Sequence, residues 1–588
     1  MAAVGTQAYT WPMMHAYDLI VIGAGAAGLA AASTAAAEGH RVLLLEHTNR
    51  VGGTTAISGG MVWIPANAKM REAGIEDSQE NALRYLSQLV PSAPDDPRMQ
   101  AYLRNGADII QYLEDRTALK LQPVRRYPDY YPDLEGATPG GRVLEPVPFD
   151  GRELGSDFAL LRDPLPEFML LGGMMISRED IPRLRRIWRS PAAALYVLKL
   201  ITRYGRQRLR AHRGTSLVLG NALAARLFKS ARDLGVEIAL NTRIDSLVSD
   251  GLRVTGIRAS LDGHAQTLES RTGVILATGG LSHDTALRAS FVPPQAEPIS
   301  ATMASGAAKG GVRLALEAGA ALSPPCHDVG DARAFWVPVS SWKRDDGSNA
   351  IFPHTVTDRA KPGLIAVNRH GRRFVNEALS YHEFGRAQLD AGNDAIPAWL
   401  VCDSRFLWKY GLGRIRPFAL STHKECRDGY LKKAGTVAEL AIAIGVPADA
   451  LSDTLQRFNA DAREGVDSEF HRGGDIYQRH LGDGERRPNP CVAPIEHGPF
   501  YAVAVTPADL GMAAGLLTDE HARVLRKDGS AIEGLYACGN DMHSVMEGAY
   551  PGPGITLGPA IVFGVTAARH ALGLAAIQRA AKSDRTKT

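Results

Sequence analysis

The stretch Tyr17–Gly28, YDLIVIGAGAAG, decides the fold of this 588-residue chain. Its first six residues predict a short buried strand, and the alanine-rich run at 29–37 predicts a helix after the glycines. A second apolar run, 41–45, follows at the spacing of a strand–helix–strand unit and ends at Glu46. Because such units form parallel sheets, we expect the chain to open with a Rossmann-like, α/β dinucleotide-binding domain.

Three glycines at the spacing GxGxxG give this turn its chemical meaning. Gly23 permits the tight turn, Gly25 lets a pyrophosphate approach the backbone, and Gly28 lets the helix pack closely on the strand. The same glycines also occur in ordinary helix–sheet packing, but here they follow a strand and precede an acid. Glu46 can bind both ribose hydroxyls of an adenosine and would repel a 2′-phosphate, which disfavours NADP and leaves FAD or NAD.

A second small-residue stretch, Gly52–Gly60 (GGTTAISGG), follows the acid. Its backbone N–H groups and hydroxyls suit further contacts to phosphates and to a flavin, although such a stretch can also be a surface loop. Two more apolar strands end in glycine turns, at 273–280 (GVILATGG) and 533–540 (EGLYACGN). They indicate that the chain returns twice to the first sheet.

Together these motifs resemble the flavoprotein superfamily of fumarate reductases, succinate dehydrogenases and 3-ketosteroid dehydrogenases. The run Gly548–Gly564, GAYPGPGITLGPAIVFG, is similar to the 3-ketosteroid Δ1-dehydrogenase branch. The resemblance implies a Rossmann-like FAD-binding domain from residues 1–295 and 497–588, with an inserted α+β catalytic domain from 296–496. The stretch 301–311, ATMASGAAKGG, departs from the TGDG-type turn that many superfamily members have there.

FAD is the cofactor that the resemblance implies, and no metal site is expected. The expected cofactor-binding residues lie in the glycine turns and at the start of the last helix. They are Gly23, Gly25, Ala26, Ala27, Gly28, Glu46, Gly53, Thr54, Thr55, Ser58, Gly59, Gly60, Ala277, Thr278, Gly279, Gly280, Gly539, Asn540, Gly554, Thr556 and Leu557.

Three tyrosines and one glycine from distant segments are the catalytic residues that the resemblance implies. Tyr381 matches the general base and Tyr131 the residue that assists it, while Tyr550 and the Gly554 N–H match the donors to the substrate carbonyl. A tyrosine is a poor base at neutral pH, so Tyr381 needs a hydrogen-bond partner or a positive field. Most tyrosines are structural, and a one-residue register error would exchange Tyr131 for Tyr130.

The activity that the resemblance implies is 1,2-dehydrogenation of a 3-ketosteroid, with electrons passing on to a quinone or other acceptor. Alternatives are desaturation at the 4,5 bond of a ketosteroid or of a non-steroidal cyclic ketone. A fumarate-type enoate reductase would need arginine clamps that the C-terminal motif lacks. A flavin-binding, membrane-associated protein without catalytic activity is the alternative from another class.

Composition limits the partners and the compartment. The net charge of +3 is too balanced for a nucleic-acid binder, and the five cysteines form no CxxC pair, so a reducing cytoplasm fits best. No secretion signal and no membrane-spanning run are expected. Within the segment 156–213, residues 178–213 hold eleven Lys or Arg and two acids among apolar residues. This pattern is typical of a solvated helical hairpin or of a basic helix at an anionic membrane surface.

Overall fold

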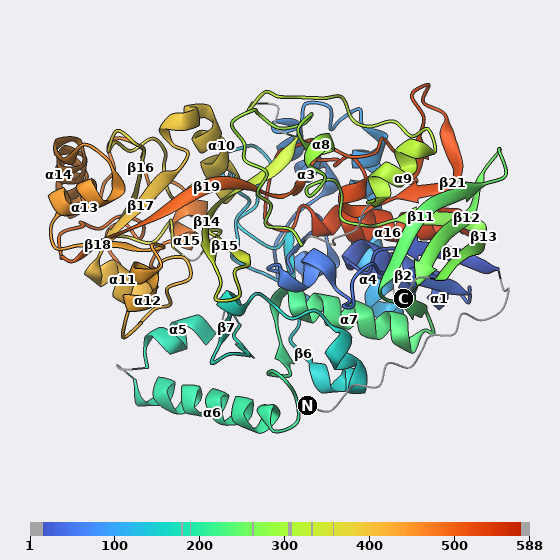
Figure 1. The fold of residues 1–588 in the computed structure, drawn as a ribbon, viewed down its shortest axis with the longest axis horizontal. Helices are drawn as coiled ribbons and strands as arrows, with labels where there is room; N and C mark the ends of the chain where they lie inside the picture. The colour runs from blue at the N-terminus through green and yellow to red at the C-terminus, as the bar shows by residue number, and fades with distance from the viewer. Residues whose placement is uncertain are drawn as a thin grey trace, which may run out of the picture.

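The protein, described from a computed structural model, has two sheets lying side by side (Figure 1). The structure describes residues 16–177, 180–187, 190–261, 264–303, 309–330, 333–356 and 358–577. One sheet has eight strands and carries the first described strand, whereas the other has six strands, and all of its strand pairs are antiparallel. The expected α/β class and the inserted α+β part are therefore both confirmed.

The eight-stranded sheet contains the parallel unit that the sequence predicts. Strand β1 (Tyr17–Ile22) has the expected bounds and pairs in parallel with β2 (Val42–Leu45) and β13 (His264–Leu276). The parallel part is completed by β10 (Glu237–Ala239) beside β2 and β21 (Ala531–Ala537) beside β13. An antiparallel extension adds β11 (Thr242–Ser249), β12 (Val254–Leu261) and β20 (Arg523–Leu525).

Helix α1 (Ala26–Ala37) lies at the centre of this half, and its first ten residues are all buried. Small alanine side chains let it pack between β1, α7 and the last helix, α16 (Leu557–Ala571). The other helices of this half are α2 (Ala68–Glu72), α3 (Gln79–Ser87), α4 (Pro97–Arg116), α7 (Leu219–Asp233), α8 (Thr285–Arg288) and α9 (Gly311–Glu317). Small sheets join β3 (Val62–Trp63), β4 (Leu121–Pro123) and β5 (Val143–Pro146), β6 (Phe149–Asp150) with β9 (Ser216–Leu217), and β7 (Met169–Leu170) with β8 (Met174–Met175).

The six-stranded sheet is built around β19 (Phe500–Met512), which pairs with β14, β17 and β18. Its other strands are β14 (Ala334–Lys343), β15 (Asn349–Pro353), β16 (Leu364–Val367), β17 (Ala398–Asp403) and β18 (Lys432–Ala434). Its helices are α10 (Tyr381–Ala391), α11 (Ser404–Tyr410), α12 (His423–Arg427), α13 (Val437–Ile444), α14 (Ala448–Glu464) and α15 (Ile476–Leu481).

The strand pairing near the expected limits of the inserted part involves both sheets. Residues 299–301 pair with Asp509 of β19 in the second sheet, whereas residues 320 and 322 bridge to 526 and 516 of the first half, so the chain contacts both sheets before β14 begins. Strand β19 is central to the second sheet, so the return comes after 512 instead of at 497. An apolar strand at a domain border carries no mark of the sheet that it joins, because both sheets bury the same residue types.

The basic segment forms two helices at the edge of the molecule, α5 (Asp180–Arg185) and α6 (Pro191–Arg208) (Figure 1). Residues 178, 179, 188 and 189 of that segment lie outside the described residues. One face of α6 is buried through Ala193, Val197, Leu200 and Tyr204, while Leu195 and Leu198 are 69% and 59% exposed. Among the helices that the structure describes, none is both long and apolar enough to cross a bilayer.

Candidate active site

The turn between β1 and α1 has the geometry of a pyrophosphate cradle. A Cβ at Gly23, whose φ is +108°, would lie 2.2 Å from the carbonyl oxygen of Ala277, and one at Gly28 would lie 1.9 Å from that of Gly23. A Cβ at Gly25 would instead face open space, with the Thr55 hydroxyl oxygen 4.0 Å away as its nearest contact. The N-cap residue of α1, Gly25, has no side chain to cap the helix, and of the first N–H groups that of Ala26 is taken by Thr55, so the helix dipole and the following N–H groups are available to a phosphate.

Glu46 is fixed at the end of β2 with its carboxylate held from both sides. One oxygen accepts from the Ala24 N–H at 2.9 Å, and the other accepts from the N–H and the hydroxyl of Thr48, both at 2.9 Å. A carboxylate has about four acceptor positions, so some remain for ribose hydroxyls. The structure thus places the acid where the sequence motif requires it.

The second glycine stretch lies against the start of α1 and is not an isolated surface loop. The Thr55 hydroxyl oxygen accepts from the Ala26 N–H at 3.1 Å, and the Thr54 hydroxyl oxygen accepts from the Met303 N–H at 3.0 Å. The Ser58 hydroxyl donates to the carbonyl of Thr55 at 2.8 Å and accepts from the Gly60 N–H at 3.0 Å. Nothing lies within 4 Å of a Cβ built on Gly59, and one on Gly53 would lie 3.6 Å from the Gly25 Cα.

Asp541 ties the two later glycine turns together, and sequence reasoning did not find it. Its carboxylate accepts from the Thr278 hydroxyl at 2.9 Å and from the Gly280 N–H at 2.8 Å. It is completely buried, and burial raises its pKa. A Cβ on Gly280 would lie 2.5 Å from the Asn540 carbonyl oxygen, so the two turns are in direct contact. The sequence signal that could have identified Asp541 is an acid directly after a glycine turn, in the run 539–541 (GND).

A small pocket lies between these turns and the second sheet. Its lining includes three of the expected cofactor residues together with Phe335 of β14. The lining residues are Phe335, Met512, Gly539, Asn540, Met542, Ser544, Val545, Ile555, Thr556, Pro559 and Ala560. Gly279 is unobstructed at its Cα, and Leu557 begins α16. Of the expected cofactor residues, Gly539, Asn540 and Thr556 thus line one pocket beside the second sheet.

A cluster of phenols stands beside this surface, where α10 begins. The ring centroids of Tyr381 and Tyr550 are 5.2 Å apart, those of Tyr130 and Tyr550 are 5.7 Å apart, and those of Tyr130 and Tyr381 are 5.8 Å apart. Tyr477 joins from α15, with its ring 4.6 Å from that of Tyr130. All four rings are buried. Two of the three expected tyrosines, Tyr381 and Tyr550, thus lie in contact.

The third expected tyrosine, Tyr131, does not occupy the cluster; its neighbour Tyr130 does. The Tyr131 hydroxyl donates to Glu383, in the first turn of α10, at 2.7 Å. The backbone bends at Tyr130, and the two neighbouring side chains have different partners. In the structure Tyr130, and not the expected Tyr131, is thus the neighbour whose ring contacts that of Tyr381. The sequence repeats tyrosine at 127, 130 and 131, and nothing in the pattern separates them.

The loop that carries Tyr550 is held tightly against the segment of Tyr130. The Tyr130 N–H donates to the carbonyl of Pro551 at 2.9 Å, and the Tyr85 hydroxyl donates to the same oxygen at 2.7 Å. Gly554 has a φ of +99°, and a Cβ there would lie 2.6 Å from the Met61 backbone. Within the described residues the Gly554 N–H has no acceptor, so it is free to donate to a ligand.

Burial shifts the pKa values of the titratable side chains in the phenol cluster. Burial raises the pKa of Tyr381 well above its usual value and that of Tyr550 to about 12. Hydrogen bonding between their hydroxyls raises the pKa of Tyr381 and lowers that of Tyr550. Burial also lowers the pKa of His382, the next residue of α10, to about 4, so its imidazole is neutral. Its Nδ1 accepts from the Trp336 N–H at 3.1 Å, which leaves the proton on Nε2.

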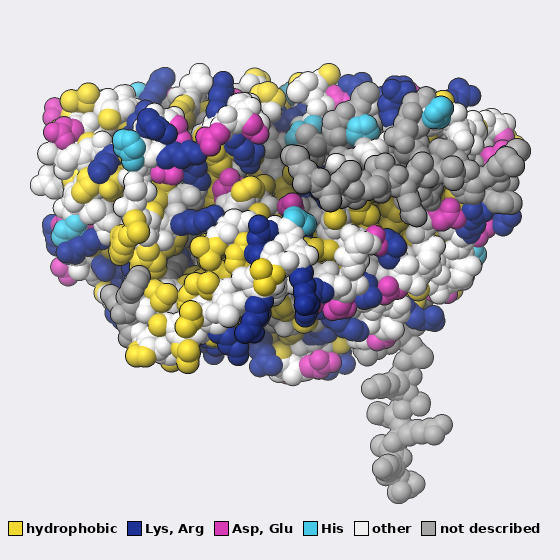
Figure 2. All heavy atoms as spheres, turned by 60° about the horizontal axis from the view of Figure 1, so that its bottom comes forward, with side chains coloured by type: hydrophobic (Ala, Val, Ile, Leu, Met, Phe, Trp, Pro, Cys, Tyr) yellow, Lys and Arg dark blue, Asp and Glu magenta, His cyan; other side chains and the backbone are white. Residues whose placement is uncertain are grey.

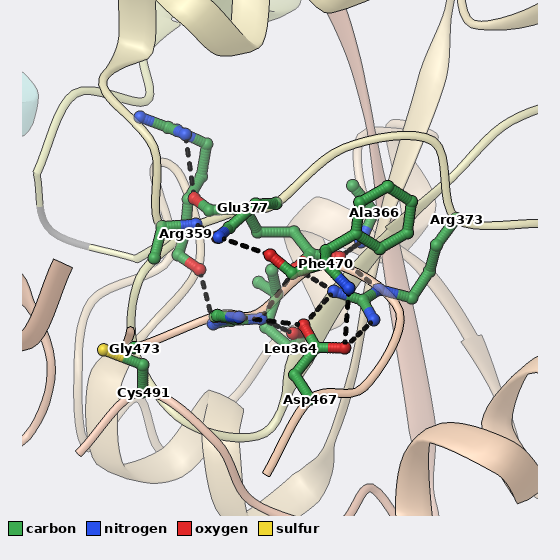
Figure 3. Close-up of polar contacts among 12 residues, drawn as sticks. Arg359, Leu364, Ala366, Arg373, Glu377, Asp467, Phe470, Gly473 and Cys491 are labelled. Atoms are coloured by element: carbon green, nitrogen blue, oxygen red, sulfur yellow. Dashed lines mark hydrogen bonds and ion pairs between the residues drawn. The ribbon is translucent and has the colours of Figure 1, made fainter. Parts of the chain in front are cut away.

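A buried ion network fixes the chain just before Tyr381 (Figure 3). Arg373 binds Glu377 and Asp467 in a bidentate manner, with N–O distances of 2.8–2.9 Å. Arg472 binds Glu377 at 3.0 Å, and Arg359 donates to the carbonyl of Glu377 at 2.9 Å. Bidentate pairs restrict orientation as well as distance, so the network holds the start of α10 in one position.

Groups of three or more His, Cys, Asp or Glu placed to bind a metal are not found in the described residues. The stretch 301–311, which departs from the superfamily pattern, is described only in part, because 304–308 lie outside the described residues. Met303, at its near end, donates to Thr54 as described above.

Comparison with known proteins agrees with this geometry. The FAD binding domain family matches residues 18–557. A 3-oxosteroid 1-dehydrogenase of Mycolicibacterium smegmatis is 37% identical, over 96% of this chain and 98% of its own length. A 4-oxocyclohex-2-ene-1-carboxylate 5-dehydrogenase of Sinomonas cyclohexanicum is 36% identical, over 95% and 94% of the two chains.

Among solved structures, the chain resembles the 3-ketosteroid Δ1-dehydrogenase of Sterolibacterium denitrificans in complex with 1,4-androstadiene-3,17-dione. The TM-score is 0.87 at 36% identity, covering 95% of this chain and all of the other. The turn, the acid and the phenol cluster thus lie in a chain that belongs to the 3-oxosteroid 1-dehydrogenase family of FAD-binding oxidoreductases.

Proposed function

We propose that this protein catalyses the 1,2-dehydrogenation of 3-ketosteroids with FAD. The observation that carries the proposal is the contact of Tyr381, Tyr550 and Tyr130 beside a free Gly554 N–H, next to the glycine turns. The reaction needs a base for the proton next to the ketone and donors for the ketone oxygen. The cluster offers both at one place.

The cofactor fits the residues present, because the one unobstructed glycine of the β1 turn, Gly25, is the N-cap residue of α1 and leaves space for a phosphate at the helix N-terminus. We assign the adenosine ribose to Glu46 and the pyrophosphate to Gly23–Gly28 with Thr54 and Thr55. We assign the flavin end of the cofactor to Ser58–Gly60, Ala277–Gly280, Gly539, Asn540 and Gly554–Leu557. When bound, FAD supplies the hydride acceptor and the chain itself has only to orient the ketone and remove the proton.

We assign the ketone oxygen to the Tyr550 hydroxyl and the Gly554 N–H. Donors already in place stabilise the negative charge that develops on this oxygen, and one such donor contributes about 3 kcal/mol. Tyr381 then removes the proton from the carbon next to the ketone. In place of Tyr131, Tyr130 is the phenol that assists it, since its ring contacts both other rings.

A neutral ketone suits the site better than a ketone that carries a carboxylate, although a relative of nearly equal similarity is named for a ring carboxylate. The cluster is lined by aromatic side chains, Phe335 among them at 5.4 Å from the Tyr550 ring centroid. The nearby Arg359 guanidinium already donates to the carbonyls of His354, Thr355, Glu377 and Leu379. It is thus not available as a clamp for a substrate carboxylate.

The experiment is anaerobic mixing of the yellow protein with androst-4-ene-3,17-dione. We expect the flavin absorbance to bleach and the 1,4-diene-3-one to form. A 5α-reduced ketosteroid shows which bond of the steroid is desaturated, because 1,2- and 4,5-dehydrogenation give different enones. Bleaching by 4-oxocyclohexanecarboxylate and not by either steroid would overturn the proposal.

We also propose that α6 docks the protein on an anionic membrane surface, where a lipid-soluble steroid and a quinone acceptor are both available. Its outward stripe of Leu195, Leu198 and Ile201 is flanked by Lys199, Arg203, Arg206 and Arg210, all exposed. Figure 2 shows hydrophobic side chains beside Lys and Arg on the face that carries this helix. Apolar insertion combined with basic flanks is typical of helices that lie in the membrane interface.

Flotation with vesicles that contain phosphatidylserine tests the docking. We expect binding that weakens with salt and is lost in the double variant Leu195→Ser, Leu198→Ser. The matched control is Leu252→Ser, which changes an exposed leucine in the β11–β12 turn. Equal flotation of all three proteins, or none at any salt concentration, would contradict the docking. Steady-state assays with a soluble quinone show separately whether a quinone reoxidises the flavin.

A further inference from the structure

A buried carboxylate lies directly behind the glycine turns that are assigned to the flavin. Asp541 is 0% exposed, and both of its neighbours in the chain, Asn540 and Met542, line the pocket beside the second sheet. Its own side chain binds the turn at 277–280, which packs closely on Gly23 of the β1 turn. The carboxylate is therefore enclosed by the segments that form this part of the site.

Three donors solvate the Asp541 carboxylate. Its Oδ1 accepts from the Thr278 hydroxyl at 2.9 Å and from the Gly280 N–H at 2.8 Å, and its Oδ2 accepts from the Thr278 N–H. The Thr278 hydroxyl oxygen in turn accepts from the Gly311 N–H at 2.8 Å. Hydrogen bonds donated to a carboxylate favour its ionised form. They act against burial, which raises the pKa of Asp541.

The described residues provide no cationic partner for Asp541. Asp509, which is also 0% exposed, instead pairs with Arg288 at 3.2 Å. The groups that contact Asp541 are backbone amides and a threonine hydroxyl, and burial raises the pKa of the nearby Cys538 thiol, so that thiol is neutral. A charge in the protein interior without a counter-ion is screened little and acts on its surroundings over a long range.

We propose that Asp541 is a positioning residue whose negative charge lowers the midpoint potential of the bound flavin. Reduction of a flavin at neutral pH adds negative charge to its ring system, and a buried anion close by makes that change less favourable. A lower potential makes the reduced cofactor a stronger reductant of the external acceptor. The inference rests on the proposed function, because it concerns the FAD that the proposed reaction requires.

The test is the midpoint potential of the flavin in Asp541→Asn, measured by spectroelectrochemical titration. Asparagine has nearly the same shape as aspartate but carries no charge. We expect the equilibrium constant for flavin reduction to be about tenfold larger than in the wild type, which is about 30 mV for a two-electron couple. The Kd for oxidised FAD, measured with the apoprotein, should rise about fivefold, because one of the three hydrogen bonds is lost.

The two measurements separate the charge of Asp541 from a purely structural role. The potential of a bound cofactor depends on the ratio of the affinities for its oxidised and reduced forms. A structural change that weakens both forms equally therefore raises the Kd and leaves the potential unchanged. That result, or a fall in the potential of Asp541→Asn, would overturn the proposal.

Asp403→Asn is the matched control. Asp403 is 2% exposed at the end of β17, and its carboxylate also accepts three N–H groups, those of Phe406, Glu496 and His497, at 2.9–3.1 Å. Because it lies outside the glycine turns, its variant should keep the wild-type potential. If Asp541→Asn does not fold, Asp541→Ser removes the same charge and leaves room for a water that accepts from the same donors, so the same rise in potential is expected.

The titration uses a chemical reductant and no steroid, so its result does not depend on the substrate. A wild-type protein that binds FAD but oxidises no ketosteroid would contradict the proposed function alone. Equal potentials in the wild type and in Asp541→Asn would contradict the role of Asp541 alone.

Discussion

The cofactor cradle and the phenol cluster are both buried and both polar, yet they are built in opposite ways. The cradle takes its decisive residues from one continuous strand–turn–helix, with Glu46 only eighteen residues beyond Gly28. The cluster takes one ring each from residues 130, 381, 477 and 550. The cradle tolerates few substitutions because its backbone is the part expected to contact the cofactor, and added side chains would block that contact. A dispersed site depends on side-chain hydroxyls that the fold must bring together.

The largest expected effect is at the cradle. Gly25→Val places a branched side chain in the open space that the glycine leaves, so the chain folds but the pyrophosphate cannot approach. We expect a colourless protein with unchanged circular dichroism. Gly205→Ala on α6, where a Cβ also meets nothing within 4 Å, is the control and should remain yellow. Full flavin content in Gly25→Val would show that this turn does not bind the cofactor.

Tyr381→Phe should impair the phenol cluster and leave the cofactor cradle unchanged. The cradle is untouched, so the flavin stays bound, whereas loss of the base slows flavin reduction by roughly 10³-fold. Stopped-flow bleaching measures the rate, and absorbance measures the flavin. Tyr204→Phe, which removes a buried hydroxyl bonded to Leu171 at a distance from the cluster, should reduce its flavin at the wild-type rate. Wild-type turnover in Tyr381→Phe would end its assignment as base.

A comparison of Tyr130→Phe with Tyr131→Phe sharpens the account of the cluster. The Tyr130 ring contacts Tyr381 and Tyr550, while the Tyr131 hydroxyl donates to Glu383. We expect a loss of flavin-reduction rate of about 10–100-fold for the first variant and less than about threefold for the second. The opposite order would restore Tyr131 as the assisting residue.

The smallest effect belongs to the support of the ribose site. Thr48→Ala removes the hydroxyl that donates to Glu46, a bond worth about 1 kcal/mol, so the Kd for FAD should rise about fivefold. Flavin titration of the apoprotein measures this change. No change in Kd would mean that the orientation of Glu46 does not depend on Thr48.

These contrasts also explain what could be predicted from the sequence. Strand 17–22 was predicted with its observed bounds, because the glycine turn that follows it marks its end. The cradle was predicted for the same reason. Tyr477 and Asp541 were not, because each acquires its meaning from a partner more than 250 residues away. Whether Tyr130 or Tyr131 contacts Tyr381 depends on the direction in which the backbone points each side chain. The sequence does not show this direction.

The packing of α1 against α16 sets a limit on when the protein can acquire its cofactor during synthesis. Helix α1 leaves the ribosome more than 500 residues before its cover, residues 557–571. Until then an alanine-rich helix that is buried in the finished protein has to remain exposed or be shielded by a chaperone. Flavin capture is therefore expected to be a late, post-translational event, and C-terminal truncations should yield aggregated apoprotein instead of a weakly active enzyme.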